Sequence, residues 1–182
     1  MYQQFQSELG KAFNQYRTNK QRAAEILEAV AEVCVKNLLI PAENIKFCIS
    51  PEHETGEGGS HSSPHRVIDR NSQGEWSAFM CIRVDTLKSS GHAITYVRLM
   101  VRFVDGAVQL GAGDDDYALE WDDRTGAKLD QLLVPFCDIL SGRVLETINW
   151  LKTGVGNPRR RIGFGSVEEA ERESRTGKVC WD

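Results

Sequence analysis

The chain has 182 residues, of which 41% are hydrophobic and 26% are charged, and its formal net charge is -4 at pH 7. This length suits one globular domain with appendages, and the composition excludes a wholly disordered chain. Counterion release needs a surplus of Lys and Arg on the binding face, so the acidic balance argues against general nucleic-acid binding.

The sequence predicts neither a secretory leader nor a membrane span. The first residues contain no basic segment followed by an apolar one, and no apolar run is long enough to cross a bilayer. We therefore expect a cytoplasmic protein that does not associate with membranes. The cysteines are odd in number and lack C-x-x-C spacing, which favours reduced thiols. They are Cys34, Cys48, Cys81, Cys137 and Cys180.

Helical structure is predicted for the first forty residues. One apolar set recurs at helical spacing: Phe5, Leu9, Ala12, Phe13 and Tyr16. A second set follows between residues 26 and 38, with Asn19 as a candidate N-cap, so two helices or one bent helix are expected. After Pro41 the apolar residues Ile45 and Phe47 alternate with polar ones, which predicts a half-buried strand.

A polar insertion at residues 51–75 follows this strand and contains His53, His61 and His65. Three imidazoles with nearby glutamates could bind a divalent metal. The stretch between His53 and His61 is rich in glycine, and no secondary structure fixes the ligand angles. We therefore favour a solvated loop and keep the metal site as the alternative.

Three further strands are predicted between turn signals: Trp76–Asp85, His92–Val104 and 107–110. Asp105-Gly106 is a strong signal for a two-residue hairpin with a type I′ turn. When Val104 is placed opposite Ala107 across this turn, apolar residues meet apolar ones and polar residues meet polar ones.

The same pairing gives the sheet an apolar face for helices to cover and a polar face. The apolar face would carry Met80, Ile82, Val84, Val97, Leu99, Val101 and Phe103, and the polar face Arg83, Asp85, Tyr96, Arg98 and Arg102. A guanidinium group suits carboxylate and phosphate oxygens, so we predict a ligand-binding site formed by Arg83, Arg98 and Arg102 with Tyr96. Alternatively the face is only solvated, and Asp85 or the acidic loop neutralises its charge.

The acidic run Asp114, Asp115 and Asp116 precedes a fifth predicted strand at 117–121. It is interpreted as a solvated loop or weak cation site. An apolar stripe from 126 to 151 predicts a closing helix with Pro135 as a kink or boundary. The tail at 157–182 combines basic residues with an aromatic one, which is typical of partner binding. These residues are Arg159, Arg160, Arg161 and Trp181.

Together these patterns predict an α+β domain at 1–156, with N-terminal helices and a long C-terminal helix covering one face of a four- or five-stranded, mainly antiparallel sheet. Our first hypothesis is a non-catalytic binding or interaction protein for a protein partner or an anionic small molecule, with homo-oligomerisation allowed. The alternative is a metal-dependent hydrolase or phosphoesterase that uses the histidines of the insertion and the acidic loop. No nucleophile signature of the G-x-S-x-G type is present.

Overall fold

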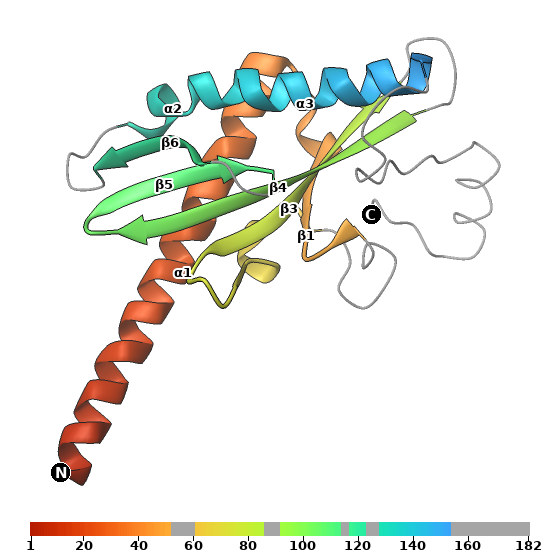
Figure 1. Cartoon of the computed structure of the whole chain (residues 1–182). Helices are drawn as coiled ribbons and strands as arrows, with labels where there is room; N and C mark the ends of the chain where they lie inside the picture. The colour runs from red at the N-terminus through yellow and green to blue at the C-terminus, as the bar shows by residue number, and fades with distance from the viewer. Residues whose placement is uncertain (52–60, 86–91, 114–116, 123–127, 154–182) are drawn as a thin grey trace, which may run out of the picture.

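A computed structural model of the chain describes residues 1–51, 61–85, 92–113, 117–122 and 128–153. Long helices lie against an antiparallel sheet of six strands, which confirms the predicted α+β class (Figure 1). The elements are α1 (Tyr2–Leu38), η1 (Ala42–Asn44), β1 (Ile45–Cys48), η3 (Pro64–Arg66), β2 (Asp69–Arg70), β3 (Trp76–Asp85), β4 (His92–Val104), β5 (Ala107–Ala112), β6 (Tyr117–Asp122), α2 (Leu129–Leu132) and α3 (Val134–Thr153). The strand order is β1-β3-β4-β5-β6, and the two-residue β2 also pairs with β3.

The β4–β5 hairpin has the predicted register. Val104 lies opposite Ala107, and Arg102 lies opposite Gln109. Both turn residues have positive φ, at 50° for Asp105 and 89° for Gly106, as a type I′ turn requires. Strands β3 and β4 have the predicted bounds, and β5 extends two residues beyond its predicted end.

Helix α1 is one continuous helix, so the predicted N-cap at Asn19 is wrong. The side-chain oxygen of Asn19 accepts a hydrogen bond from the Gln15 side chain at 2.8 Å, within the same helix. Its neighbours in sequence include Arg17, Lys20 and Gln21, which are good helix formers, so nothing local ends the helix there. The helix ends at Leu38, where Leu39 takes the left-handed conformation at φ 54°.

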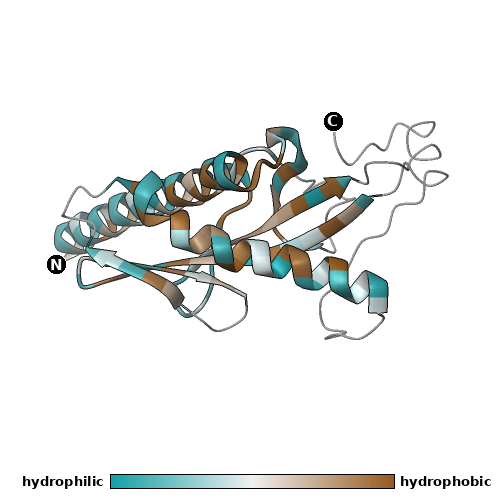
Figure 2. Cartoon of the chain, turned by 90° about the horizontal axis from the view of Figure 1, so that it is seen from above, coloured by the Kyte–Doolittle hydropathy of each residue, from teal (hydrophilic) through white to brown (hydrophobic). Residues whose placement is uncertain are grey.

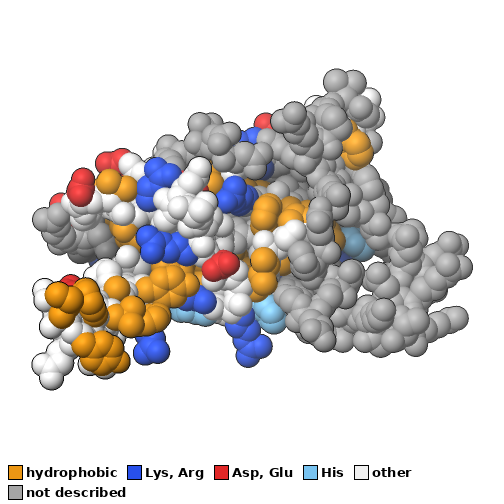
Figure 3. Space-filling model, turned by 60° about the horizontal axis from the view of Figure 1, so that its bottom comes forward, with side chains coloured by type: hydrophobic (Ala, Val, Ile, Leu, Met, Phe, Trp, Pro, Cys, Tyr) orange, Lys and Arg blue, Asp and Glu red, His pale blue; other side chains and the backbone are white. Residues whose placement is uncertain are grey.

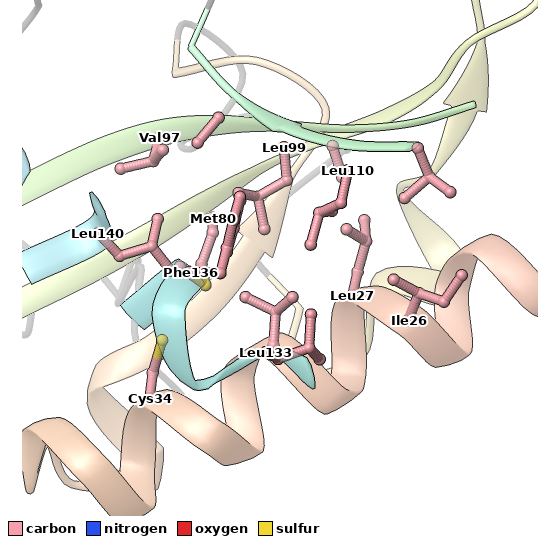
Figure 4. Close-up of a cluster of buried hydrophobic side chains, with 14 of the residues drawn as sticks. Ile26, Leu27, Cys34, Met80, Val97, Leu99, Leu110, Leu133, Phe136 and Leu140 are labelled. Carbon is pink, nitrogen blue, oxygen red and sulfur yellow. The ribbon is translucent and has the colours of Figure 1, made fainter. Parts of the chain in front are cut away.

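Helices α1 and α3 pack on the same sheet face and enclose the hydrophobic core. Leu27 of α1 and Phe136 of α3 are fully buried together with Leu99 of β4 (Figure 4). Apolar and polar residues alternate along both helices, as expected for amphipathic helices with one covered side (Figure 2). Pro135 lies in the first turn of α3, after the separate short helix α2, so it marks a helix boundary as predicted.

The second half of the insertion is ordered, so the solvated-loop interpretation is wrong for residues 61–75. Backbone groups of Phe47 and His61 exchange two hydrogen bonds of 2.7 Å, which pairs the edge of β1 that faces away from β3. Val67 and Ile68 are buried in the main core. All four residues of β1 are buried, whereas the alternation of apolar and polar residues had predicted a strand with only one buried face. Unpaired backbone groups at a sheet edge are costly to bury, and the bridge to His61 supplies partners.

Residues 1–18 of α1 are all exposed, and burial in this helix begins at Ala23. The N-terminal half of α1 thus projects beyond the sheet, as Figure 1 shows. No helix within the described ranges is long and apolar enough to cross a membrane. The acidic run at 114–116 and the tail at 157–182 lie outside the described residues.

Gly106→Val should lower the free energy of unfolding by about 2 kcal/mol, because a β-branched residue is strained at positive φ. Gly10→Ala is the matched control in an exposed part of α1, where an added Cβ meets nothing within 4 Å. It should raise stability by about 0.5–1 kcal/mol, because alanine favours helix. Urea unfolding of both variants checks the pair, and equal effects would contradict the turn assignment.

Candidate binding site on the outer face of the sheet

The outer face is the sheet face opposite α1 and α3, and the predicted ligand-binding residues all lie on it. On β3 and β4 it carries Ser77, Phe79, Cys81, Arg83, Tyr96, Arg98, Met100 and Arg102. Arg83 lies opposite Ile94, four residues before Arg98, and Arg102 lies four residues after Arg98. At 3.3 Å per residue, the three arginines form a row with a spacing of about 13 Å along β4. Figure 3 shows several Lys and Arg side chains on the underside of the molecule.

Arg83, at one end of the row, is paired with a carboxylate. Its Nε donates to Asp85 Oδ1 at 2.7 Å, and the Asn44 side chain donates to Asp85 Oδ2 at 3.1 Å. Desolvation is the largest single influence on the pKa of Asp85 and raises it, but the hydrogen bonds from Arg83 and Asn44 and the nearby charges of Arg83 and His92 together hold the pKa below the usual value. The pair is largely solvated, so its contribution to stability is small.

Arg102, at the other end, is paired with a buried carboxylate. Its guanidinium donates to Oε1 of Glu75, whose side chain is almost fully buried. The Asn71 side chain donates to Glu75 Oε2 at 2.7 Å and accepts the Glu75 backbone N–H at 3.0 Å. Gly74 in this turn has φ 83°, which favours glycine. The turn between β2 and β3 therefore holds Glu75 against Arg102.

Arg98, at the centre of the row, has no ion pair within the part of the chain that the structure describes. It is partly buried and lies opposite Phe79, with Tyr96 and Met100 next to it on the same face of β4. Arginine stays charged in proteins, so this cation has uncharged neighbours along β4 and across to β3. Among the described residues, two of the three predicted arginines therefore have a carboxylate partner and Arg98 has none.

A small apolar cluster adjoins Arg98 on the outer face. Cys48, Cys81 and Ile94 are buried there, and Phe79 and Tyr96 pack against them. The Sγ atoms of Cys48 and Cys81 are 3.3 Å apart on neighbouring strands. This packing fixes Tyr96 beside Arg98. Sequence patterns did not predict this cluster, because it depends on the pairing of β1 with β3, which places Cys48 opposite Phe79.

Of the predicted metal ligands, His61 and His65 are described and occupy different settings. His61 pairs with Phe47 through its backbone, and the Nε2 atom of His65 lies 3.6 Å from a carboxylate oxygen of Glu28 on α1. Within the described ranges, no three His, Cys, Asp or Glu side chains come together. His53, like Asp114, Asp115 and Asp116, lies outside these ranges, so the metal site stays a prediction.

The predicted partner-binding residues of the tail also lie outside the described ranges. They are Arg159, Arg160, Arg161 and Trp181. Their role therefore stays a prediction.

Two further thiols, Cys34 of α1 and Cys137 of α3, lie in the main core with their Sγ atoms 3.9 Å apart. Burial raises the pKa of both thiols, and the proximity of Cys137 raises that of Cys34 further. A thiol nucleophile needs a lowered pKa, so this pair is structural.

Comparison of the chain with protein-family models, with curated proteins and with solved structures finds no match. The chemistry of the site is therefore the basis for a functional proposal. The outer face combines a cation, aromatic rings and hydrogen-bonding groups, which suit the binding of a negatively charged ligand.

Replacing Arg102 by Leu should lower the free energy of unfolding by about 3 kcal/mol, because it leaves the Glu75 carboxylate buried without its cation. Arg83→Leu is the matched control and should change it by less than about 1 kcal/mol, since the Arg83–Asp85 pair is exposed. Adding Glu75→Leu to Arg102→Leu should restore part of the loss. Similar small effects of both single variants in urea unfolding would contradict this ranking.

The buried thiols predict a loss of stability at alkaline pH. Their pKa values are raised in the folded state, so the unfolded chain releases these protons first, and the free energy of unfolding falls as pH rises above about 9. The double variant Cys34→Ala/Cys137→Ala should lose less stability between pH 7 and pH 10 than the parent. Urea midpoints at both values measure this, and an unchanged alkaline loss would contradict the prediction.

Proposed function

We propose that the protein is a non-catalytic binding protein that holds an acidic segment of a protein partner on the outer face of its sheet. Arg98 is the central contact, and Tyr96 of β4 and Arg83 of the neighbouring β3 extend the site along the strand direction. The observation that carries the proposal is the position of Arg98, a partly buried cation that has no carboxylate partner among the described residues, between two arginines that each have one.

The three arginines differ in how far a carboxylate of the protein already neutralises them, and this decides which of them can bind an anionic ligand. A cation that is partly removed from water loses solvation, and an anionic ligand at Arg98 would restore a counter-charge. Arg102 is held by buried Glu75 and serves the fold. Arg83 pairs with Asp85 in a largely solvated contact, so a ligand carboxylate could compete for it at little cost. The cationic site therefore runs from Arg98 toward Arg83, with Tyr96 between them.

The spacing of this site favours an extended peptide over a small anion. Arg83 and Arg98 are separated by about 13 Å along the strand direction. In an extended peptide, side chains at positions i and i+4 lie on the same side and are also separated by about 13 Å. A partner segment with acidic residues at that interval would meet both arginines, whereas a single phosphate would reach only one.

The test uses fluorescence anisotropy with a labelled decapeptide that carries Glu at positions i and i+4, and the same peptide with Gln at both positions. The parent protein should bind the Glu peptide, and Arg98→Gln should weaken binding at least about tenfold, the loss expected for one charge-assisted contact. Lys36→Gln on the exposed side of α1 makes the same charge change away from the site and should bind like the parent.

Binding should also weaken with added salt, because the contacts are partly solvated. Equal binding of the Glu and Gln peptides would contradict the proposal. So would an Arg98→Gln variant that binds as tightly as Lys36→Gln.

The alternative of a metal-dependent hydrolase gains no support from the described residues. His61 and His65 have separate surroundings, and no cluster of metal-binding side chains is found within the described ranges.

A further inference from the structure

The projecting half of α1 carries a continuous apolar stripe on its exposed surface. The exposed fractions are 74% for Tyr2, 64% for Phe5, 57% for Leu9, 57% for Phe13 and 37% for Tyr16. The Tyr16 ring lies 4.8 Å from that of Trp76, so the stripe begins where the helix leaves the body of the domain. Apolar side chains gather at this protruding end in Figure 3.

The stripe is symmetric about Leu9 in both spacing and residue type. Phe5 and Phe13 lie four residues before and after Leu9. Tyr2 and Tyr16 lie seven residues before and after it. At 100° per residue, all four lie within roughly 40° of Leu9 around the helix axis. The sequence of the stripe is therefore Tyr-Phe-Leu-Phe-Tyr in either direction.

We propose that the protein forms a homodimer in which the projecting halves of two α1 helices pair antiparallel, with the twofold axis at Leu9. In this arrangement Phe5 of one copy meets Phe13 of the other. Tyr2 likewise meets Tyr16, and Leu9 meets its own equivalent. A twofold interface requires a surface that complements itself, and the symmetric stripe meets this requirement.

The area of the stripe is sufficient for a specific interface. With about 200 Å² for each fully exposed large side chain, the five residues expose roughly 600 Å² in one copy and roughly 1,200 Å² in a pair. Specific protein interfaces bury about 1,200–2,000 Å² in total, so full coverage of the stripe in both copies reaches the lower end of this range. The stripe is also at the upper end of the apolar patches that monomers expose, which are about 300–600 Å² at their largest.

The charges on the projecting half favour a second copy over a membrane surface. Only Glu8, Lys11 and Arg17 are charged among residues 1–18, and Glu8 pairs with Lys11 at 2.8 Å in the same helix. The remaining polar positions are mostly Gln, Asn and Ser. Helices that bind membrane surfaces usually carry a polar side rich in Lys and Arg. A nearly neutral helix also avoids repulsion between two copies.

The pairing is sterically feasible. Residues 1–18 are all exposed, and the Tyr16 ring contacts Trp76 at the point where the body begins, so the helix before it is open to a partner. With Leu9 at the axis, residue 16 of one copy lies level with residue 2 of the other. The two bodies then lie at opposite ends of the paired segment, separated by about 20 Å of helix at 1.5 Å per residue.

Sedimentation equilibrium of the full chain tests the dimer. At about 100 µM the parent should have the mass of two chains, and Leu9→Glu should raise the dissociation constant at least about tenfold, because two carboxylates would meet at the axis. Ser7→Glu, on the opposite side of the helix, is the control and should dimerise like the parent. Because Leu9 is largely exposed, Leu9→Glu should not unfold the domain, and a thermal unfolding transition like that of the parent verifies this.

Cysteine cross-linking tests the direction of pairing. In an equal mixture of Phe5→Cys and Phe13→Cys chains, mild oxidation should join residue 5 of one chain to residue 13 of the other, identified by mass spectrometry of the linked peptides. A parallel pair would instead link residue 5 to residue 5, which would overturn the proposed arrangement.

Other outcomes would overturn the dimer itself. A parent protein that is monomeric at about 100 µM would do so, as would a dimer that Leu9→Glu leaves intact. A monomer that co-sediments with vesicles of phosphatidylcholine and phosphatidylserine would assign the stripe to a membrane surface instead.

Discussion

The antiparallel register between β3 and β4 determines which side chains enter the core and which face the other way. It places Met80 opposite Val97 and Ala78 opposite Leu99, all on the side that α1 and α3 cover. A shift of one residue would turn the opposite set, including Arg98, into the core. Burying that arginine in an apolar core would cost several kcal/mol, so the same register that builds the core also fixes the charged row.

The two arginine–carboxylate pairs of the outer face differ in how deeply the carboxylate is buried. The buried carboxylate of Glu75 is held by Arg102 of β4 and by the side chain of Asn71 in the turn between β2 and β3. The exposed carboxylate of Asp85 has comparable partners in Arg83 and Asn44 but remains in contact with water. Loss of a partner is therefore costly at the first pair and mild at the second, although both are arginine–carboxylate contacts.

Local patterns predicted most of the sheet. Asp105 and Gly106 specify a tight turn, and alternation on either side fixes the register of the hairpin. The same alternation placed the three arginines and Tyr96 on one face. The sequence also offered Asp85 as a counter-charge, and Asp85 pairs with Arg83. The partner of Arg102 could not be predicted, because Glu75 meets Arg102 across 27 positions of sequence. Whether an arginine is neutralised depends on which turn lies next to it, and that depends on tertiary structure.

The errors of sequence interpretation also have physical causes. The bridge between Phe47 and His61 is a backbone contact and leaves no side-chain pattern, so an ordered segment looked like a loop. In α1 the apolar residues before Tyr16 have the same spacing as those after Ala23. Periodicity shows that a helix has an apolar side, but not whether the domain is long enough to cover it.

In the projecting half of α1, the stability of the helix and the binding of a partner depend on each other. An isolated helix of this length is marginal in water, and Gly10 weakens it by about a further 1 kcal/mol relative to alanine. Its order comes from the buried half of the same helix, which acts as a nucleus at one end. Any surface that covers the stripe also stabilises these helical turns, so part of the binding free energy is spent on ordering the segment. The length of this segment therefore sets both the area available for contact and the entropic cost of using it.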